Sequence, residues 1–273
     1  MKLTAYLPKT TPSTLHSATT HPFLRLAGSG QIPKPLLAQW LSQDRLYAQS
    51  YVRFIGHLLT KIRLPQTPSS STQTQLNTST SESIQEKILD ILLFALNNIR
   101  TELKFFEDTA AEYGLDLNTP PITSSNFEGN PSQFTSGPIT QSYIDMFMSA
   151  GSPGSSLLEG VVVLWSTEIC YLRAWRYAAS FLEGSQSASG SGEDKDGGAL
   201  REKFIPNWAS REFEEFVDRI GAVLDEYAAG EGVTGEGEGG DLQERCERWW
   251  RQVVWLEERF WPEIGSCLTL APE

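Results

Sequence analysis

Several long segments of this chain carry apolar residues at the spacing of an α-helix, and this pattern constrains the fold more than any other feature. Between residues 36 and 59, leucine, isoleucine and aromatic residues recur so that one or two helix faces are apolar. The same spacing predicts helices over residues 83–113, 155–182, 210–229 and 242–267. Alternating patterns typical of strands are nearly absent. Long helices without strand partners predict an all-α bundle.

Residues at the starts of these segments are typical of helix N-termini. Pro33 and Pro35 stand just ahead of the first segment, where the missing N–H of a proline costs little. Ser83, with Glu86 three residues later, predicts a capping box. Ser210 precedes an acidic first turn, which suits the positive end of a helix dipole. These signals agree with the boundaries that the apolar spacing predicts.

Length and composition predict one folded unit with polar insertions. The chain has 273 residues, of which 40% are hydrophobic, so it can bury a sizeable core. We expect a single domain over residues 1–273. Three polar stretches, around 65–81, 184–200 and 230–241, are rich in Ser, Thr, Gly or acidic residues. Because such stretches bury little apolar area, we expect weak order there.

Charge and cysteine content narrow the classes of partner and compartment. The 34 acidic residues exceed the 22 basic ones and give a formal charge of −12, which disfavours nucleic acid and anionic membrane as partners. Cys170, Cys246 and Cys267 lack CxxC spacing, which suggests thiols in a reducing compartment. No apolar run reaches membrane-spanning length and no targeting segment is recognised. We therefore expect a cytoplasmic protein. The three scattered histidines predict neither a metal site nor a heme.

Polar residues on apolar helix stripes mark a candidate pocket. Asp44, Tyr47 and Tyr51 follow one another at i, i+3 and i+7, so a carboxylate and two phenols share a face. Glu257 lies three residues before Phe260 in another apolar stripe. Further candidates are Tyr143, in a helix expected after Pro138, and the run from Thr167 to Tyr171. Carboxylates and aromatic walls suit a flat, nitrogen-rich, partly cationic ring.

Structural roles compete with this reading for several residues. For Tyr51 we favour a core tyrosine with backbone partners. Glu168 is evenly balanced between a pocket carboxylate and a helix salt bridge, for example with Arg173. Cys170 and Cys246 are expected to be inert small hydrophobes.

Short motifs along the chain resemble those of the TenA/thiaminase II family. They occur in the family's order, cover nearly the whole chain, and leave the three polar stretches as insertions. Each motif alone is weak, whereas the ordered set is specific. The matching segments are His21-Pro22-Phe23-Leu24, Gln43-Asp44-Arg45-Leu46-Tyr47, the stretch from Pro138 to Tyr143, the stretch from Phe204 to Phe213, and Glu257 to Trp261.

The resemblance implies a heme-oxygenase-like all-α fold with a pocket for the aminopyrimidine part of thiamin or its breakdown products. It implies no cofactor, and a homo-oligomer such as a dimer or tetramer. Carried over by motif position, Asp44 would bind the pyrimidine nitrogen and amine, Tyr47 would line the site, Tyr143 would stack on the ring, Tyr171 would be a hydrogen-bonding wall, Glu257 would be the acid–base carboxylate, and Phe260 would enclose the ring.

One departure from the family bears on mechanism. The nucleophilic cysteine of one branch of the family is matched here by Thr167, and a threonine hydroxyl is a poor substitute for a thiolate. Making Cys170 the nucleophile would break the match at Tyr171. Glu168 instead resembles the Cys-lacking branch, which uses carboxylates. A smaller departure is Phe204, where the family usually has Trp.

The resemblance thus implies a hydrolase that acts on amino- or formylamino-pyrimidines in thiamin salvage. Two alternatives remain open. The first is a catalytically silent protein that binds an aminopyrimidine or thiamin. The second is a different reaction on the same scaffold, such as that of relatives of the PQQ-synthesis oxidase type.

Overall fold

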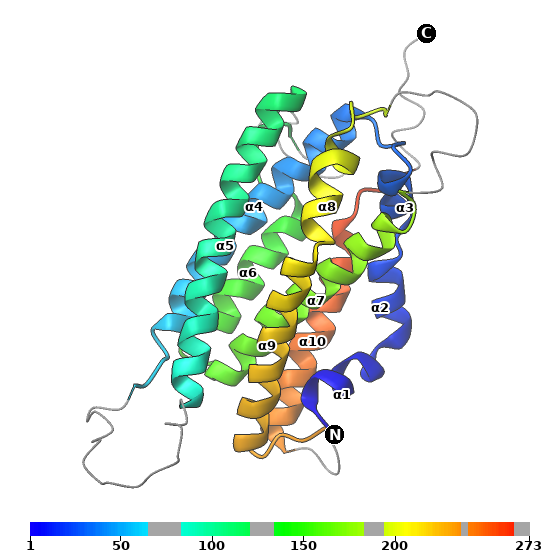
Figure 1. Ribbon diagram of the computed structural model, residues 1–273. Coiled ribbons are helices and arrows are strands. Elements are labelled where there is room, and N and C mark those ends of the chain that lie inside the picture. The colour runs from blue at the N-terminus through cyan, green and yellow to red at the C-terminus, as the bar shows by residue number, and fades with distance from the viewer. Residues whose placement is uncertain (65–82, 121–133, 183–193, 236–239, 265–273) are drawn as a thin grey trace, which may run out of the picture.

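The computed structural model describes residues 1–64, 83–120, 134–182, 194–235 and 240–264, and these residues form helices and turns without a strand (Figure 1). This all-helical architecture confirms the predicted fold class. The helices are α1 (Leu3–Thr10), α2 (Pro12–Thr19), α3 (Pro22–Gly28), α4 (Lys34–Leu59), α5 (Ile84–Tyr113), α6 (Pro138–Gly151), α7 (Leu157–Ala179), the π-helical segment η1 (Leu200–Phe204), α8 (Ile205–Trp208), α9 (Arg211–Gly230) and α10 (Asp241–Phe260).

The long helices lie side by side as a bundle (Figure 1). Helix α4 packs against α5 on one side and α6 on the other, while α7 packs against α9 and α10. The short helices α2 and α3 cover α7, and α1 contacts α9 and α10. Apolar faces of α4, α6, α7 and α10 meet in the middle, so the core lies between helices that are far apart in sequence.

The predicted helix starts are confirmed. On α5 the Ser83 hydroxyl accepts from the Glu86 N–H at 3.3 Å, and the Glu86 carboxylate accepts from the Ser83 N–H at 2.8 Å. The Ser210 hydroxyl caps α9 by accepting from the Phe213 N–H at 3.1 Å. Each cap supplies partners for N–H groups that have none inside the helix. Helix α5 ends at Gly114, whose φ of +63° suits a residue without a side chain.

The predicted extent of the last helix is wrong at its C-terminus. Helix α10 ends at Phe260, and Trp261 has extended backbone angles of φ −75° and ψ 137°. The cause is Pro262, because a proline disfavours helical angles in the residue before it. Cys267, which the prediction included, lies outside the described residues.

The three N-terminal helices were not predicted from the apolar spacing. Each has only seven or eight residues, too few for a helical period to stand out. The start of α3 does follow its sequence signal. His21 caps it, since its ring Nδ1 accepts from the Phe23 N–H at 3.2 Å, and Pro22 occupies the first turn.

The expected weak order of the second polar stretch is wrong for residues 194–200. Asp196 is only 1% exposed, and its carboxylate accepts from the N–H groups of Gly198 and Leu200 at 3.0 and 2.8 Å. This carboxylate therefore fixes the chain just where η1 begins. The first polar stretch, residues 65–81, lies outside the described residues, as do 184–193 and 236–239.

Close approach of backbones sets the position of α3 against α7. A side chain at Gly28 would place its Cβ 2.0 Å from the carbonyl oxygen of Ala178. Because backbone cannot move away as a flexible side chain can, only glycine fits there. Helix α3 is thereby held against the end of α7.

A cluster of aromatic side chains fills one end of the core. Trp175 lies 5.6 Å from Trp40 and 4.4 Å from Trp208 between ring centroids, and Trp261 stacks on Trp40 at 5.8 Å. Phe204, which stands where the family usually has Trp, stacks on Trp208 at 4.8 Å. The cluster makes a rigid wall, and Trp208 carries it to the edge of the site described below.

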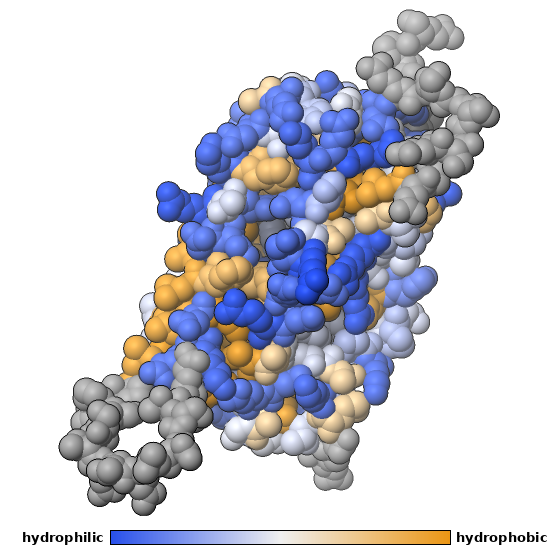
Figure 2. Space-filling model, viewed as in Figure 1, coloured by the Kyte–Doolittle hydropathy of each residue, from blue (hydrophilic) through white to orange (hydrophobic). Residues whose placement is uncertain are grey.

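The surface is mainly polar, with apolar side chains gathered along the edge that α5 forms (Figure 2). Leu93 and Phe94 of α5 are 50% and 39% exposed. None of the helices in the described segments combines the length and the hydropathy that a membrane span requires.

Candidate functional site

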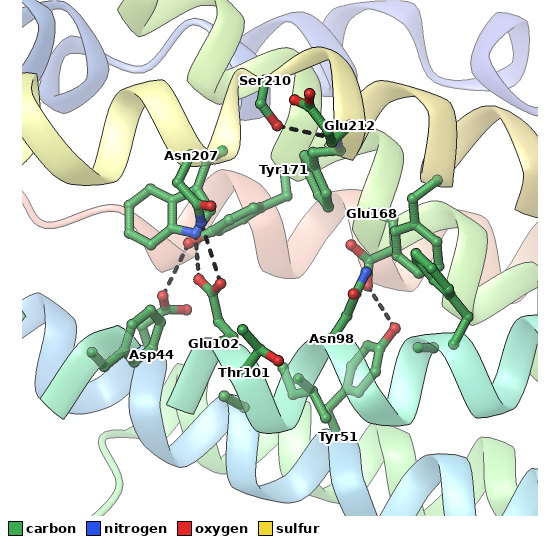
Figure 3. A pocket seen from close by; sticks show the side chains of 18 of the residues that line it. Asp44, Tyr51, Asn98, Thr101, Glu102, Glu168, Tyr171, Asn207, Ser210 and Glu212 are labelled. Atoms are coloured by element: carbon green, nitrogen blue, oxygen red, sulfur yellow. Dashed lines mark hydrogen bonds between the residues drawn. The ribbon is translucent and has the colours of Figure 1, made fainter. Parts of the chain in front are cut away.

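A cavity of about 240 Å³ opens between α4, α5, α7 and the α8–α9 segment. Aromatic rings form much of its wall, and polar side chains from each element reach into it (Figure 3). The lining residues are Asp44, Tyr47, Ala48, Tyr51, Phe94, Ala95, Asn98, Ile99, Thr101, Glu102, Phe106, Glu168, Tyr171, Asn207, Trp208, Ser210, Glu212, Phe213 and Phe216.

One face of α4 supplies Ala48 and three polar residues at the spacing that the sequence predicted. Asp44, Tyr47 and Tyr51 all line the cavity. Asp44 is 2% exposed, and its Oδ2 accepts a hydrogen bond from the Tyr171 hydroxyl at 3.0 Å. Burial raises the pKa of Asp44 well above its usual value, the hydrogen bond opposes that rise, and the charges of Glu102 and Glu257 add to it. A carboxyl held in this way can accept hydrogen bonds from ring N–H groups and amines.

Glu168 of α7 meets Tyr51 of α4 at the wall of the cavity (Figure 3). The Tyr51 hydroxyl donates to Glu168 Oε1 at 2.6 Å. The expectation that Tyr51 bonds only to backbone is therefore wrong, and Glu168 takes the pocket position rather than a pairing with Arg173. Burial raises the pKa of Glu168 to about 7, against the opposing effect of the Tyr51 hydrogen bond. Such a carboxyl exchanges protons readily near neutral pH.

Glu257, Tyr143 and Phe260 lie one layer behind the cavity wall. The ring of Tyr47 separates them from the space, with its centroid 5.1 Å from that of Tyr143 and 5.9 Å from that of Phe260. Tyr143 is fully buried, and its hydroxyl donates to Glu257 Oε1 at 2.6 Å. The three side chains are close to the site but are absent from its lining.

The pKa of Glu257 is also strongly raised. Burial raises its pKa to about 8, the Tyr143 hydrogen bond lowers it, and the charge of Glu168 raises it further. Its Oε2 is buried and has no hydrogen-bond partner among the described residues. A carboxyl in these surroundings is mainly protonated at neutral pH.

Thr167 and Cys170 are both absent from the lining of the cavity. The Thr167 hydroxyl donates to the carbonyl groups of Val163 and Leu164, at 3.2 and 3.0 Å, within its own helix. Cys170 is fully buried, and burial followed by the charge of Glu257 raises its thiol pKa well above the usual value. Neither side chain lines the cavity, so neither is placed as a nucleophile.

Glu102 of α5 is a site residue that the sequence analysis missed. Its Oε1 accepts from the indole N–H of Trp208, and its Oε2 accepts from the Asn207 amide at 3.3 Å. Burial raises its pKa to about 7, and these two hydrogen bonds lower it. One sequence signal points to it: Glu102 stands at helical spacing between Ile99 and Phe106, so it interrupts an apolar stripe.

The charges around the cavity are all of one sign. The lining includes four acidic side chains, Asp44, Glu102, Glu168 and Glu212, and no lysine, arginine or histidine. Uncompensated carboxyls favour a ligand that brings N–H donors or positive charge, and they disfavour a phosphate. Among the residues that the structure describes, no three His, Cys, Asp or Glu side chains come together as a metal site.

Comparisons with known proteins agree with this architecture. The sequence profile of the TENA/THI-4/PQQC family matches residues 9–231. A TenA homologue from Pyrococcus furiosus, 23% identical, superposes with a TM-score of 0.67 over 95% of this chain and 98% of its own. A TenA family transcription regulator from Silicibacter, 14% identical, superposes with a TM-score of 0.66 over 95% of both chains. At these identities the likeness establishes the fold.

Two curated relatives are longer than this chain. A protein of Fusarium pseudograminearum described as a probable transcription factor is 32% identical over 279 residues, which are 93% of this chain and 50% of the relative. A soybean (Glycine max) protein described as a probable bifunctional TENA-E protein is 20% identical over 63% of this chain and 61% of its own length. The chain thus spans about half to three fifths of these relatives.

Proposed function

Because the chain belongs to the TENA/THI-4/PQQC family, we propose that it is an aminopyrimidine hydrolase of thiamin salvage that acts on amino- or formylamino-pyrimidines without a cofactor. One observation carries the proposal. The cavity combines aromatic walls with three buried or half-buried carboxyls from different helices and lacks a cationic lining residue. This chemistry suits a flat heterocycle with exocyclic amines.

In this proposal Asp44 orients the ring. Its protonated carboxyl, favoured by burial, donates to a ring nitrogen and accepts from the exocyclic amine of the pyrimidine, while the Tyr171 hydroxyl holds Oδ2 in place. Tyr47 and Tyr51 provide aromatic faces on the same helix side. A ring held at both its edge and its face presents one substituent to the opposite end of the cavity, where Glu168 lies (Figure 3).

Glu168 performs the proton transfers. Its carboxylate takes a proton from water as the water oxygen bonds to the carbon that carries the leaving nitrogen, and it returns a proton to that nitrogen as the C–N bond breaks. A pKa of about 7 suits both steps, since each needs the opposite protonation state.

Glu257 was expected to be the acid–base carboxylate, and its distance from the wall suggests a supporting part. Through Tyr143 it fixes the layer against which Tyr47 packs. In that case Glu257→Gln weakens turnover less than Glu168→Gln does.

The test is a product assay. Purified protein should release a hydroxymethyl aminopyrimidine from the aminomethyl precursor, or hydrolyse the formylamino precursor, as followed by chromatography and mass spectrometry. Glu168→Gln should remove the activity and keep the helical circular dichroism. The half-buried, ion-paired Glu258 lies outside the cavity lining and offers a matched control, and Glu258→Gln should retain wild-type turnover. Absence of product from the wild type would refute the hydrolase.

A silent binding protein is the second candidate, and Thr167 favours it. The nucleophile position of the cysteine branch holds a hydroxyl that is bonded to its own helix. Calorimetry that detects aminopyrimidine binding with no product formed would support this candidate. A cytoplasmic location, assembly as a dimer or tetramer, and the absence of a nucleic-acid partner stay predictions.

A further inference from the structure

We propose that Asn98 of α5 is a catalytic hydrogen-bond donor that stabilises negative charge on the formyl oxygen when the protein hydrolyses a formylamino-pyrimidine. This inference rests on the proposed function and deepens it, because it names the group that would allow the site to cleave an amide as well as an amine. Asn98 belongs to none of the motifs that carry the family resemblance.

Asn98 places an unused amide on the cavity wall. It lies one helical turn from Phe94 and one turn from Glu102, and all three side chains line the cavity. The Asn98 side chain is half-buried and makes no hydrogen bond within the described segments of the chain. An asparagine amide offers two N–H donors and one carbonyl acceptor, so a half-buried amide without partners is open to a ligand.

The direction of this side chain supports the assignment. Asn98 reaches from α5 toward the end of the cavity where Glu168 and Tyr51 lie (Figure 3). Glu168 is bonded to the Tyr51 hydroxyl, and no hydrogen bond joins it to Asn98 in the described part of the chain. The carboxyl and the amide can therefore act on different atoms of one substrate group, the first on its nitrogen and the second on its carbonyl oxygen.

Most of the other side-chain donors in the lining are already committed. They bond to carboxyls of the cavity or to backbone, and they are Tyr51, Thr101, Tyr171, Asn207 and Trp208. No lysine, arginine or histidine lines the cavity. Negative charge that develops on a substrate oxygen therefore needs a neutral donor, since the surrounding carboxyls would otherwise repel it, and Asn98 supplies one.

The amide hydrolysis balances with these groups alone. The water oxygen bonds to the formyl carbon as Glu168 takes one water proton, and an electron pair of the C=O bond moves onto the oxygen that Asn98 contacts. That pair returns as the C–N bond breaks, and the nitrogen keeps the bond electrons and takes the proton from Glu168. The products are formic acid and the aminomethyl pyrimidine. An aminomethyl substrate reacts at a saturated carbon and forms no oxygen anion there, so its hydrolysis gains nothing from Asn98.

The experiment measures kcat and KM for two substrates on four proteins. The substrates are a 4-aminopyrimidine with a 5-formylaminomethyl group and the same ring with a 5-aminomethyl group. The proteins are the wild type, Asn98→Ala, Asn98→Leu and Asn97→Ala. Asn97 is an exposed neighbour in the same helix that does not line the cavity, so its change is a matched control.

We expect Asn98→Ala and Asn98→Leu to lower kcat for the formylamino substrate by about 10²–10³, with a smaller change in KM. The kcat for the aminomethyl substrate should stay within about threefold of the wild type, and Asn97→Ala should match the wild type with both substrates. An unchanged kcat for the formylamino substrate, or an equal loss for both substrates, would overturn the role of Asn98.

Urea unfolding separates this role from a structural one. Because Asn98 has no hydrogen-bond partner in the described segments, and alanine and leucine are better helix formers than asparagine, both variants should unfold at the same or a higher urea concentration than the wild type. Failure of both variants to fold would show that this side chain is needed for packing and would overturn the inference. A wild type that hydrolyses neither substrate overturns the proposed function as well, whereas one that hydrolyses only the aminomethyl substrate overturns this inference alone.

Discussion

The protonation of Glu257 makes the stability of the protein depend on pH in a predictable direction. Its pKa is raised from 4.5 to about 8 in the folded chain, because burial disfavours the charged form. Below pH 4.5 both the folded and the unfolded chain hold this proton. Between 4.5 and 8 only the folded chain holds it, so the free energy of unfolding falls as the pH rises through this window and levels off above it.

The magnitude follows from the two pKa values. Between pH 5 and 8 this one group should lower the free energy of unfolding by about 3–4 kcal/mol, as an upper estimate. Glu257→Gln carries no titrating proton, so its stability should change with pH by that much less. The side-chain amide of the glutamine can still accept from Tyr143, which keeps the local hydrogen bond.

Urea unfolding, followed by the helical circular dichroism between pH 5 and 9, measures the difference. Glu102 and Glu168 titrate in both proteins, so their contributions to the pH dependence of the free energy of unfolding largely cancel in the comparison. The control is Glu258→Gln, because Glu258 is paired with Arg259 at the surface of the same helix. This change should leave the pH dependence of the free energy of unfolding as it is in the wild type. Parallel pH slopes for wild type and Glu257→Gln would refute the inference that Glu257 is protonated in the folded chain.

Three further predictions concern the site. Glu168→Gln should lower kcat by about 10²–10⁴. Tyr51→Phe should move the acidic limb of the pH–rate profile to higher pH, because the Tyr51 hydrogen bond lowers the Glu168 pKa and its removal lets that pKa rise; a limb that stays in place would contradict this pairing. Asp44→Asn should weaken aminopyrimidine binding about tenfold in calorimetry, and unaltered affinity would remove Asp44 from the ring contact. Cys170→Ala should keep wild-type turnover, and the wild-type enzyme should resist iodoacetamide, since the thiol is fully buried. Rapid inactivation of the wild type that Cys170→Ala abolishes would show that this thiol is reactive.

The assignment of roles to Glu168 and Glu257 depends on the tyrosine layer between them. Tyr51 bonds to the first and Tyr143 to the second, while Tyr47 packs between the cavity and Tyr143. Two carboxyls with raised pKa values thus stand on opposite sides of one aromatic ring. Only Glu168, on the cavity side, can reach a ligand without rearrangement of Tyr47.

Local signals in the sequence were sufficient for the helices and for one face of the site. Helical spacing, the Ser83 capping box and the Ser210 cap depend on residues a few positions apart, and each is confirmed. The grouping of Asp44 with Tyr47 on α4 has the same local origin, because i and i+3 share a helix face whatever surrounds them. Where a local signal was overlooked, as with Pro262, the predicted helix ran too far.

Only the tertiary structure decided which polar side chains face the cavity. Glu102 and Glu168 line the same cavity because α5 and α7 both pack against α9, and Glu257 stays behind Tyr47 because α10 packs against α6 and α7. Those distances depend on how whole helices pack, which no short spacing along the chain encodes. The sequence by itself therefore determined helices and candidate carboxyls, and packing between distant segments determined their depth, their partners and their protonation.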